Sequence, residues 1–135
     1  MPPKMLTNYD IEKAKQKCHY SLPNPAHYHD DCIRIAYEWL DAQKPIKNPQ
    51  LKVLDLKHII ENWAGRYLSR SDVEVAATLH PKFFGRYPCY NLSSKLVRPS
   101  TARLKHITEA FTHKQYLKNA DLYPYHTTEK LPAEE

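Results

Sequence analysis

Apolar residues recur at helical spacing in two segments near the middle of the chain. In residues 55–67 the positions on one face are all apolar: Leu56, Ile59, Ile60, Trp63, Ala64 and Tyr67. Residues 30–43 carry a similar apolar stripe, with charged residues on the opposite face. Such stripes are typical of amphipathic helices that bury one face, so both segments are predicted to be helical, with Asp55 and either Asp30 or Asp31 as their N-caps.

Capping signals predict shorter helices elsewhere. Residues 71–74 (SDVE) match a capping box, which predicts a helix from residue 72 that ends near His80, because Pro81 follows. Asp10 is the candidate cap of a helix over residues 11–18.

Two more helices are predicted after residue 90. Asn91 and Ser100 are candidate N-caps for helices over residues 91–98 and 101–111. The fold class is therefore mainly α, a small single-domain helical bundle of about five helices, with a short hairpin near residues 82–90 as an option.

Prolines and polar stretches divide the chain into three parts. We expect residues 1–29 to form a tail and a Pro-rich entry segment, and residues 30–112 to form the helical core domain. Residues 113–135 are expected to form a C-terminal extension that is weakly ordered at its end.

Composition narrows the classes of function. Two glycines among 135 residues argue against a Gly-rich phosphate loop or a dinucleotide-binding fold. No secretory signal fits the N-terminus, and no stretch approaches the roughly 20 apolar residues that span a bilayer. We therefore expect a soluble, cytoplasmic protein with no membrane partner. Three widely spaced cysteines indicate no disulfide framework.

Positive charge is concentrated in residues 75–108. This segment holds six Lys or Arg residues and no Asp or Glu, whereas residues 1–74 have a net charge of +1 and residues 109–135 a net charge of −2. An uneven distribution of this kind is expected where a protein meets a polyanion. A solvated basic face without a partner is the alternative interpretation.

The predicted helices 55–67, 72–80 and 91–98, taken in series, resemble the tri-helical helix-turn-helix class of DNA-binding domain. The sequences VAATL (75–79) and NLSSKL (91–96) carry this resemblance. In that class, small residues in the second helix permit close packing, and the third helix presents Ser, Asn, Lys and Arg side chains to base edges and phosphates.

This resemblance implies a protein that binds duplex DNA, either as a regulator of transcription or as an accessory to replication or maintenance, and it allows a homodimer. The connection from His80 to Tyr90 departs from the pattern, because it is longer than the usual turn of three or four residues.

A nucleic-acid interface is therefore predicted within residues 82–105. Helix starts at Asn91 and Ser100 would offer free N–H groups to phosphates, although plain capping is the alternative role of both residues. The predicted contact residues are Lys82, Arg86, Tyr87, Asn91, Ser93, Ser94, Lys95, Arg98, Ser100, Arg103 and Lys105.

Aromatic and cationic residues alternate in KFFGRYPCY, residues 82–90. The first alternative function is a protein-interaction module, an inhibitor or adaptor, that docks an acidic protein partner. The mixture of aromatic and cationic residues favours a second alternative, binding of RNA or single strands by base stacking. For Phe83 or Phe84 we expect a role as a plug in the core, because two exposed Phe side chains are costly in water.

Two other groups of residues contain side-chain types that occur in metal sites and in catalytic sites. One group has the side-chain types that bind zinc: Cys18, His19, His27, His29 and Cys32. Their spacing matches no known zinc finger, so no metal and no cofactor is expected. Cys89 with His80 or His106 lacks a nearby carboxylate to orient the histidine, so no enzymatic activity is expected.

Overall fold

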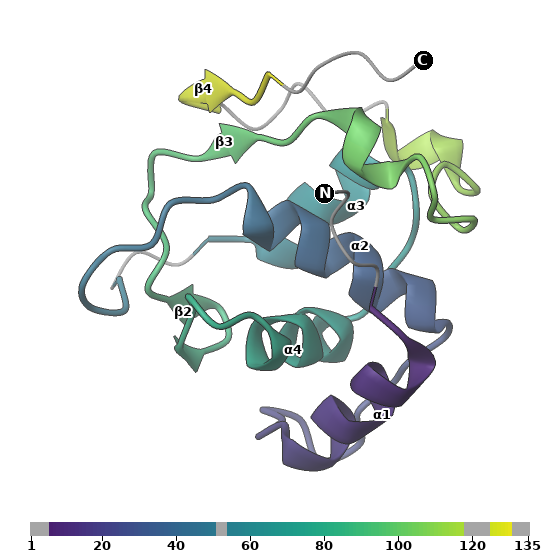
Figure 1. Ribbon diagram of the computed structural model, residues 1–135, viewed down its shortest axis with the longest axis vertical. Helices are drawn as coiled ribbons and strands as arrows, with labels where there is room; N and C mark the ends of the chain where they lie inside the picture. The colour runs from purple at the N-terminus through teal and green to yellow at the C-terminus, as the bar shows by residue number, and fades with distance from the viewer. Residues whose placement is uncertain (1–5, 51–53, 118–124, 131–135) are drawn as a thin grey trace.

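Four α-helices are the main regular elements of the described residues (Figure 1). The computed structural model describes residues 6–50, 54–117 and 125–130. The helices are α1 (Asn8–Lys17), α2 (Asp30–Asp41), α3 (Leu56–Ala64) and α4 (Arg70–Leu79). The fold is mainly α, as predicted, but the described residues contain four α-helices instead of about five.

Short strands and a 3₁₀ helix complete the fold. Strands β1 (Gly85–Arg86) and β2 (Cys89–Tyr90) form an antiparallel hairpin, which confirms the hairpin expected near residues 82–90. Strand β3 (Val97–Arg98) pairs in parallel with β4 (Thr127–Thr128), and the 3₁₀ helix η1 (Thr101–Leu104) lies between them in sequence.

The helix starts are capped by residues that precede the predicted caps. Thr7 caps α1 in a capping box, in which Asp10 is the return partner and not the cap. His29 caps α2 by accepting a hydrogen bond from the Asp31 N–H at 2.9 Å. Ser69 caps α4 in a second capping box with Asp72. The predicted caps of these three helices were therefore wrong.

Gly65 ends α3 earlier than predicted. Its φ of 59° lies in the left-handed region, and its N–H bonds the Glu61 carbonyl at 2.8 Å. A left-handed glycine directly after the last turn is a common helix stop. The chain then turns within residues 65–69 and starts α4.

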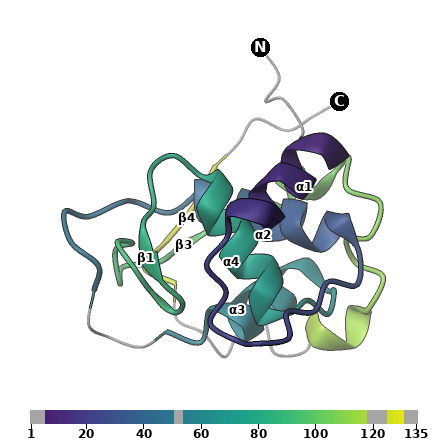
Figure 2. The same cartoon turned by 90° about the horizontal axis from the view of Figure 1, so that it is seen from below.

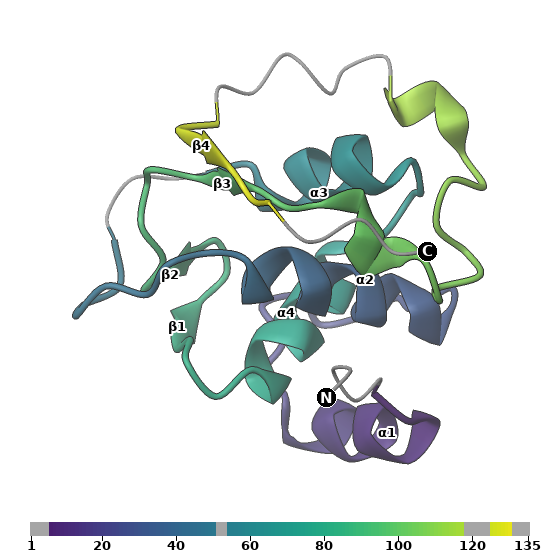
Figure 3. The same cartoon turned by 45° about the horizontal axis from the view of Figure 1, so that its top comes forward.

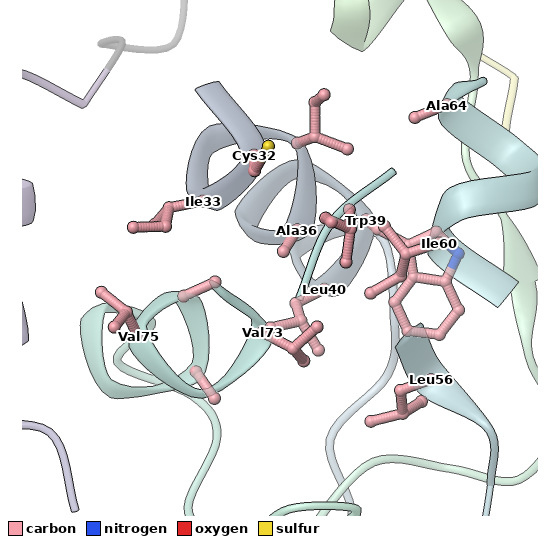
Figure 4. Close-up of a cluster of buried hydrophobic side chains, with 14 of the residues drawn as sticks. Cys32, Ile33, Ala36, Trp39, Leu40, Leu56, Ile60, Ala64, Val73 and Val75 are labelled. Carbon is pink, nitrogen blue, oxygen red and sulfur yellow. The ribbon is translucent and has the colours of Figure 1, made fainter. Parts of the chain in front are cut away.

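The core lies where α2, α3 and α4 meet. Figure 4 shows side chains of these helices pointing toward one another, among them Trp39, Ile60 and Val73, which are all fully buried. Phe83 adds to this core from the loop before the hairpin, with 6% of its surface exposed. Phe84 is 53% exposed, so Phe83 is the plug that the sequence required.

Residues 91–98 do not form the predicted helix. They pass through a bridge between Leu92 and Pro45 and bends at residues 94 and 95, and then enter β3. The buried side chain of Gln43 takes the place of a strand partner there. Its Oε1 accepts from the Val97 N–H at 3.0 Å and its Nε2 donates to the Val97 carbonyl at 2.8 Å. A helix of under two turns is costly to nucleate, and the Pro99 that follows disfavours a helical conformation at Arg98.

The predicted helix over residues 101–111 is also replaced, here by η1 and a series of turns. Trp63 on α3 fixes the start of this segment, because its Nε1–H donates to the Pro99 carbonyl at 2.9 Å. Strands β3 and β4 lie beside α2 and α3 (Figure 3). Residues 131–135, at the expected weakly ordered end, lie outside the described residues.

The segment before α2 covers α4 (Figure 2). Ile11 and Ala14 of α1 are buried, so part of the expected tail and entry segment contributes to the core. His27 Nδ1 lies 2.7 Å from Asp72 Oδ1, and the Ser21 N–H donates to Glu74 at 2.9 Å. The outward face of α4 is therefore occupied by residues of the same chain.

Candidate nucleic-acid interface

The eleven predicted contact residues do not form one surface. Some lie at the hairpin end of the molecule, where the loop after α2, the hairpin and the chain leading to β3 lie side by side (Figure 1). Others lie in β3 and η1, which pack against α2 and α3. The residues therefore divide into buried, internally paired and exposed groups.

Asn91 is buried and is not a helix cap. Its Oδ1 accepts from the Phe84 N–H at 2.7 Å, and its Nδ2 donates to the carbonyls of Ile46 and Lys82 at 3.1 Å each. The side chain therefore joins the loop after α2 to the hairpin loop. Its amide is fully used inside the protein, so its predicted contact with phosphate is corrected to a structural role.

Ser100 caps a short turn. Its Oγ accepts from the Ala102 N–H at 3.2 Å, and its own N–H donates to Glu129 Oε1 at 2.9 Å. The element that it caps, η1, spans four residues. The Ala102 and Arg103 N–H groups at this helix start, which were expected to be free for a phosphate, are both bonded to Ser100.

Arg103 is neutralised inside the fold. Its guanidinium donates to Glu129 at 2.6 and 2.7 Å, to Glu38 at 3.0 Å and to Asp41 at 2.9 Å. The acid-free window of the sequence did not reveal these partners, because Glu38 and Asp41 precede Arg103 by about 60 residues. Arg103 is therefore corrected from a phosphate contact to the centre of an internal ion cluster.

The ion cluster shifts the pKa values of its three carboxylates, and the surroundings of each carboxylate set the direction of the shift. The hydrogen bond from His80, helped by Arg103, lowers the pKa of Asp41 to about 2. The hydrogen bond from Arg103 lowers the pKa of Glu129. Burial raises the pKa of Glu38, and Arg103 offsets that rise only in part. These shifts agree with a cluster that holds β4, η1 and the end of α2 together.

Arg98 and Lys105 also make interactions within the chain. Arg98 is half-buried in β3, where its carbonyl accepts from the Glu129 N–H at 2.8 Å.

Five exposed cations at the hairpin end have no carboxylate partner among the described residues. Three were predicted, and two come from the loop after α2; we call this set the basic end: Lys44, Lys47, Lys82, Arg86 and Lys95. Backbone hydrogen bonds hold the three segments together. The Ser93 N–H donates to the Lys44 carbonyl and the Ile46 N–H to the Asn91 carbonyl, both at 2.8 Å, and the Asn91 N–H donates to the Phe84 carbonyl at 3.1 Å.

Lys44 and Lys47 were missed because they lie far from the acid-free window. A local signal for them existed, since residues 44–50 contain both lysines, two prolines and no acid. Their position beside Lys95 follows from the bridge between Pro45 and Leu92, which no sequence pattern indicated.

The remaining predicted residues border the basic end. Ser94 is exposed, and Ser93 accepts from the Lys95 N–H at 3.2 Å through its Oγ. Tyr87 is half-buried, with its hydroxyl accepting from the Lys57 N–H at 3.2 Å. Phe84 is exposed beside these residues, and it is the aromatic side chain in the hairpin loop that is most open to a base.

Histidine and cysteine residues of the expected zinc-ligand types have structural partners. His27 lies 2.9 Å from the Tyr20 hydroxyl in addition to its contact with Asp72, and the Cys32 thiol donates to the Tyr67 carbonyl at 3.5 Å. Within the described residues, no three His, Cys, Asp or Glu side chains are grouped as a metal site would need.

Comparison of the chain with protein-family models, with curated proteins and with solved structures found no match. None of the helices in the described ranges has the length and apolar character needed to cross a membrane. The site is therefore interpreted from its own geometry.

Proposed function

We propose that this protein binds nucleic acid through the basic end. The observation that carries this proposal is the set of five exposed cations, brought together from three segments of the chain and left without carboxylate partners among the described residues. Lys and Arg side chains bind the phosphate backbone chiefly by releasing its condensed counterions. A grouped, unopposed set of cations is suited to this.

Duplex DNA is the favoured ligand, with contacts to phosphates and without a helix in the groove. Helices α3 and α4 are joined by a short turn that contains Gly65, a feature also typical of helix-turn-helix proteins, and this supports the choice of duplex DNA. The outward face of α4, however, carries Asp72 and Glu74 and is covered by residues 19–27. We therefore expect the protein to contact DNA phosphates and not base edges, whether it acts in regulation or in maintenance.

Salt dependence tests the proposal. If all five cations contact phosphate, the slope of log affinity against log salt is about −4.5 for duplex DNA. The Lys82→Ala/Lys95→Ala variant should reduce the slope to about −2.7. Lys17→Ala/Lys114→Ala removes the same charge from exposed positions elsewhere and should keep the slope of the wild type. Equal effects of the two variants, or affinity independent of salt, would contradict the proposal.

Single-stranded nucleic acid is a second candidate, favoured by the exposure of Phe84. An aromatic ring beside cations can stack on an unpaired base, and such stacking contributes about 1–3 kcal/mol per base. Phe84→Ala should then weaken binding to single-stranded DNA or RNA by about tenfold or more and leave duplex binding unchanged. If the basic end retains an acidic protein and no nucleic acid, the alternative of a protein-interaction module replaces both candidates.

A further inference from the structure

Two adjoining hollows lie between the C-terminal end of α1, helix α4 and the hairpin. The inner hollow has a volume of about 260 Å³ and the outer one about 500 Å³. Both are lined by Cys18, His19, Glu74 and Arg86. Glu74 is therefore the acidic side chain shared by the two, and it comes from the middle of α4.

Glu74 is buried without a full set of hydrogen bonds. The residue is 4% exposed, and its Oε2 accepts from the Ser21 N–H at 2.9 Å. Its Oε1 is buried and has no hydrogen-bond partner among the described residues. Buried polar atoms in native proteins are nearly always satisfied, so an orphaned carboxylate oxygen indicates a missing donor.

The charge of Glu74 acts on the walls of the hollow. Burial, followed by the charge of Glu74, raises the pKa of Tyr90. Burial also raises the pKa of the Cys18 thiol, with a further contribution from Glu74. Burial is the larger cause of both shifts, and the charge of Glu74 adds to each in the same direction.

Aromatic side chains form much of the inner wall: Phe83, Phe84, Tyr87 and Tyr90. Aromatic faces attract cations, and cages of this kind recognise organic ammonium groups. Tyr90 is 4% exposed, and its hydroxyl makes no hydrogen bond to any described residue. It adds a second polar group that a ligand can meet.

We propose that this hollow binds an organic cation, an alkyl ammonium or alkyl guanidinium group on a short unbranched chain. The cationic head supplies the donors that Glu74 Oε1 lacks, and the carbon chain lies against the aromatic wall. The volume of the inner hollow suits a group the size of one long side chain. The ligand is either a free small amine or the Lys or Arg side chain of a peptide, since both present the same chemistry.

Arg86 is expected to lower the affinity of the hollow for a simple organic cation. Its guanidinium is exposed and lines both hollows, so it repels a bound cation or competes with it for Glu74. Arg86→Ala should therefore strengthen binding of a simple amine. The site shares Arg86 with the basic end, but the other four cations of the basic end line neither hollow. The Lys82→Ala/Lys95→Ala variant therefore tests nucleic-acid binding without altering this site.

The test uses titrations of the full chain with n-butylammonium chloride, n-butylguanidinium chloride and n-butanol, followed by backbone amide NMR at matched ionic strength. We expect saturable shifts at Thr78 and Tyr90 with the two cations and at least tenfold weaker binding of n-butanol. A titration with N-acetyl-lysine methylamide distinguishes a peptide side chain from a free amine. If it binds as tightly as n-butylammonium, the ligand is a peptide side chain; if it binds much more weakly, the ligand is a free amine.

Glu74→Gln is the decisive variant, since it keeps the shape of the side chain and an oxygen for the Ser21 N–H. We expect at least a tenfold loss of cation binding with no change for n-butanol. If this variant unfolds, Thr78→Leu at the exposed edge of the hollow should block entry and give the same loss. Equal binding of amine and alcohol, or cation binding that survives both variants, would overturn the proposal.

Discussion

Replacement of Arg103 separates structural from binding roles among the cations. Its guanidinium makes four hydrogen bonds to three carboxylates, at 2.6 to 3.0 Å. Removing one partner of a buried ion pair costs about 3–5 kcal/mol. The Asp41 side chain is 40% exposed and remains solvated after the loss, so we expect Arg103→Ala to lower the free energy of unfolding by about 2–3 kcal/mol.

The loss can be converted into a melting temperature. With an unfolding entropy of about 2.1 cal/mol/K per residue, a chain of 135 residues loses about 7–11 °C. Urea denaturation and calorimetry measure this change. Binding of duplex DNA, corrected for the folded fraction and followed by fluorescence anisotropy, should stay within about twofold of the wild type.

Lys95→Ala is the matched control, and it should show the opposite pattern. Because the Lys95 side chain is exposed and has no partner among the described residues, its loss should change stability by less than about 0.5 kcal/mol. Its DNA affinity should fall, with the salt slope reduced by about 0.9. The reasoning fails if Arg103→Ala leaves stability within about 0.5 kcal/mol of the wild type or weakens DNA binding as much as Lys95→Ala does.

Three further predictions concern stability. Gln43→Ala should cost about 2–4 kcal/mol in urea denaturation, because both backbone groups of Val97 lose their buried partner. Gly65→Ala should cost about 1–2 kcal/mol, since φ is 59° and a Cβ would lie 3.3 Å from Phe111 Cα. Asp41, with its pKa lowered from 3.8 to about 2, contributes stability that is present above pH 3.8 and lost as the pH falls toward 2; Asp41→Asn should flatten this acid limb in pH-dependent thermal melts.

The helices that bury one face were predictable from the sequence. In α2 and α3 the apolar stripe is local and repeats over two or more turns, so no distant contact is needed to specify it. Their ends were less predictable. His29 caps α2 through its side chain, and Gly65 ends α3 through its left-handed backbone, and apolar periodicity reports neither.

The structure of residues 91–98 could not be predicted from local sequence patterns. Asn91 has the residue type of a helix cap, but it bonds groups from residues 46, 82 and 84. Val97 is paired by a side chain 54 positions earlier. These tertiary contacts outweigh a weak preference for helix, because a segment of eight residues gains little from helix formation on its own.

The candidate site was predictable in part for a similar reason. Lys82, Arg86 and Lys95 were found because the window lacks acids, and they remain exposed. Arg103 was misassigned by the same criterion, because its carboxylates lie outside the window. The count of charges along the chain therefore located a basic region but did not identify which of its cations are available.

Internal pairing explains why the cations of the basic end have no carboxylate partner among the described residues. The carboxylates of the helices are used by nearby cations, as Asp31 is by Arg34 and Glu61 is by Lys57, each pair at 2.7 Å. The loops at residues 44–50, 82–84 and 93–95 contain no acid, and no such pairing reaches their lysines. The potential at the basic end is therefore positive because the carboxylates of the protein lie elsewhere and are paired there with other cations. It follows that affinity for a polyanion must depend on which cation is removed, and a change in net charge alone cannot reproduce that dependence.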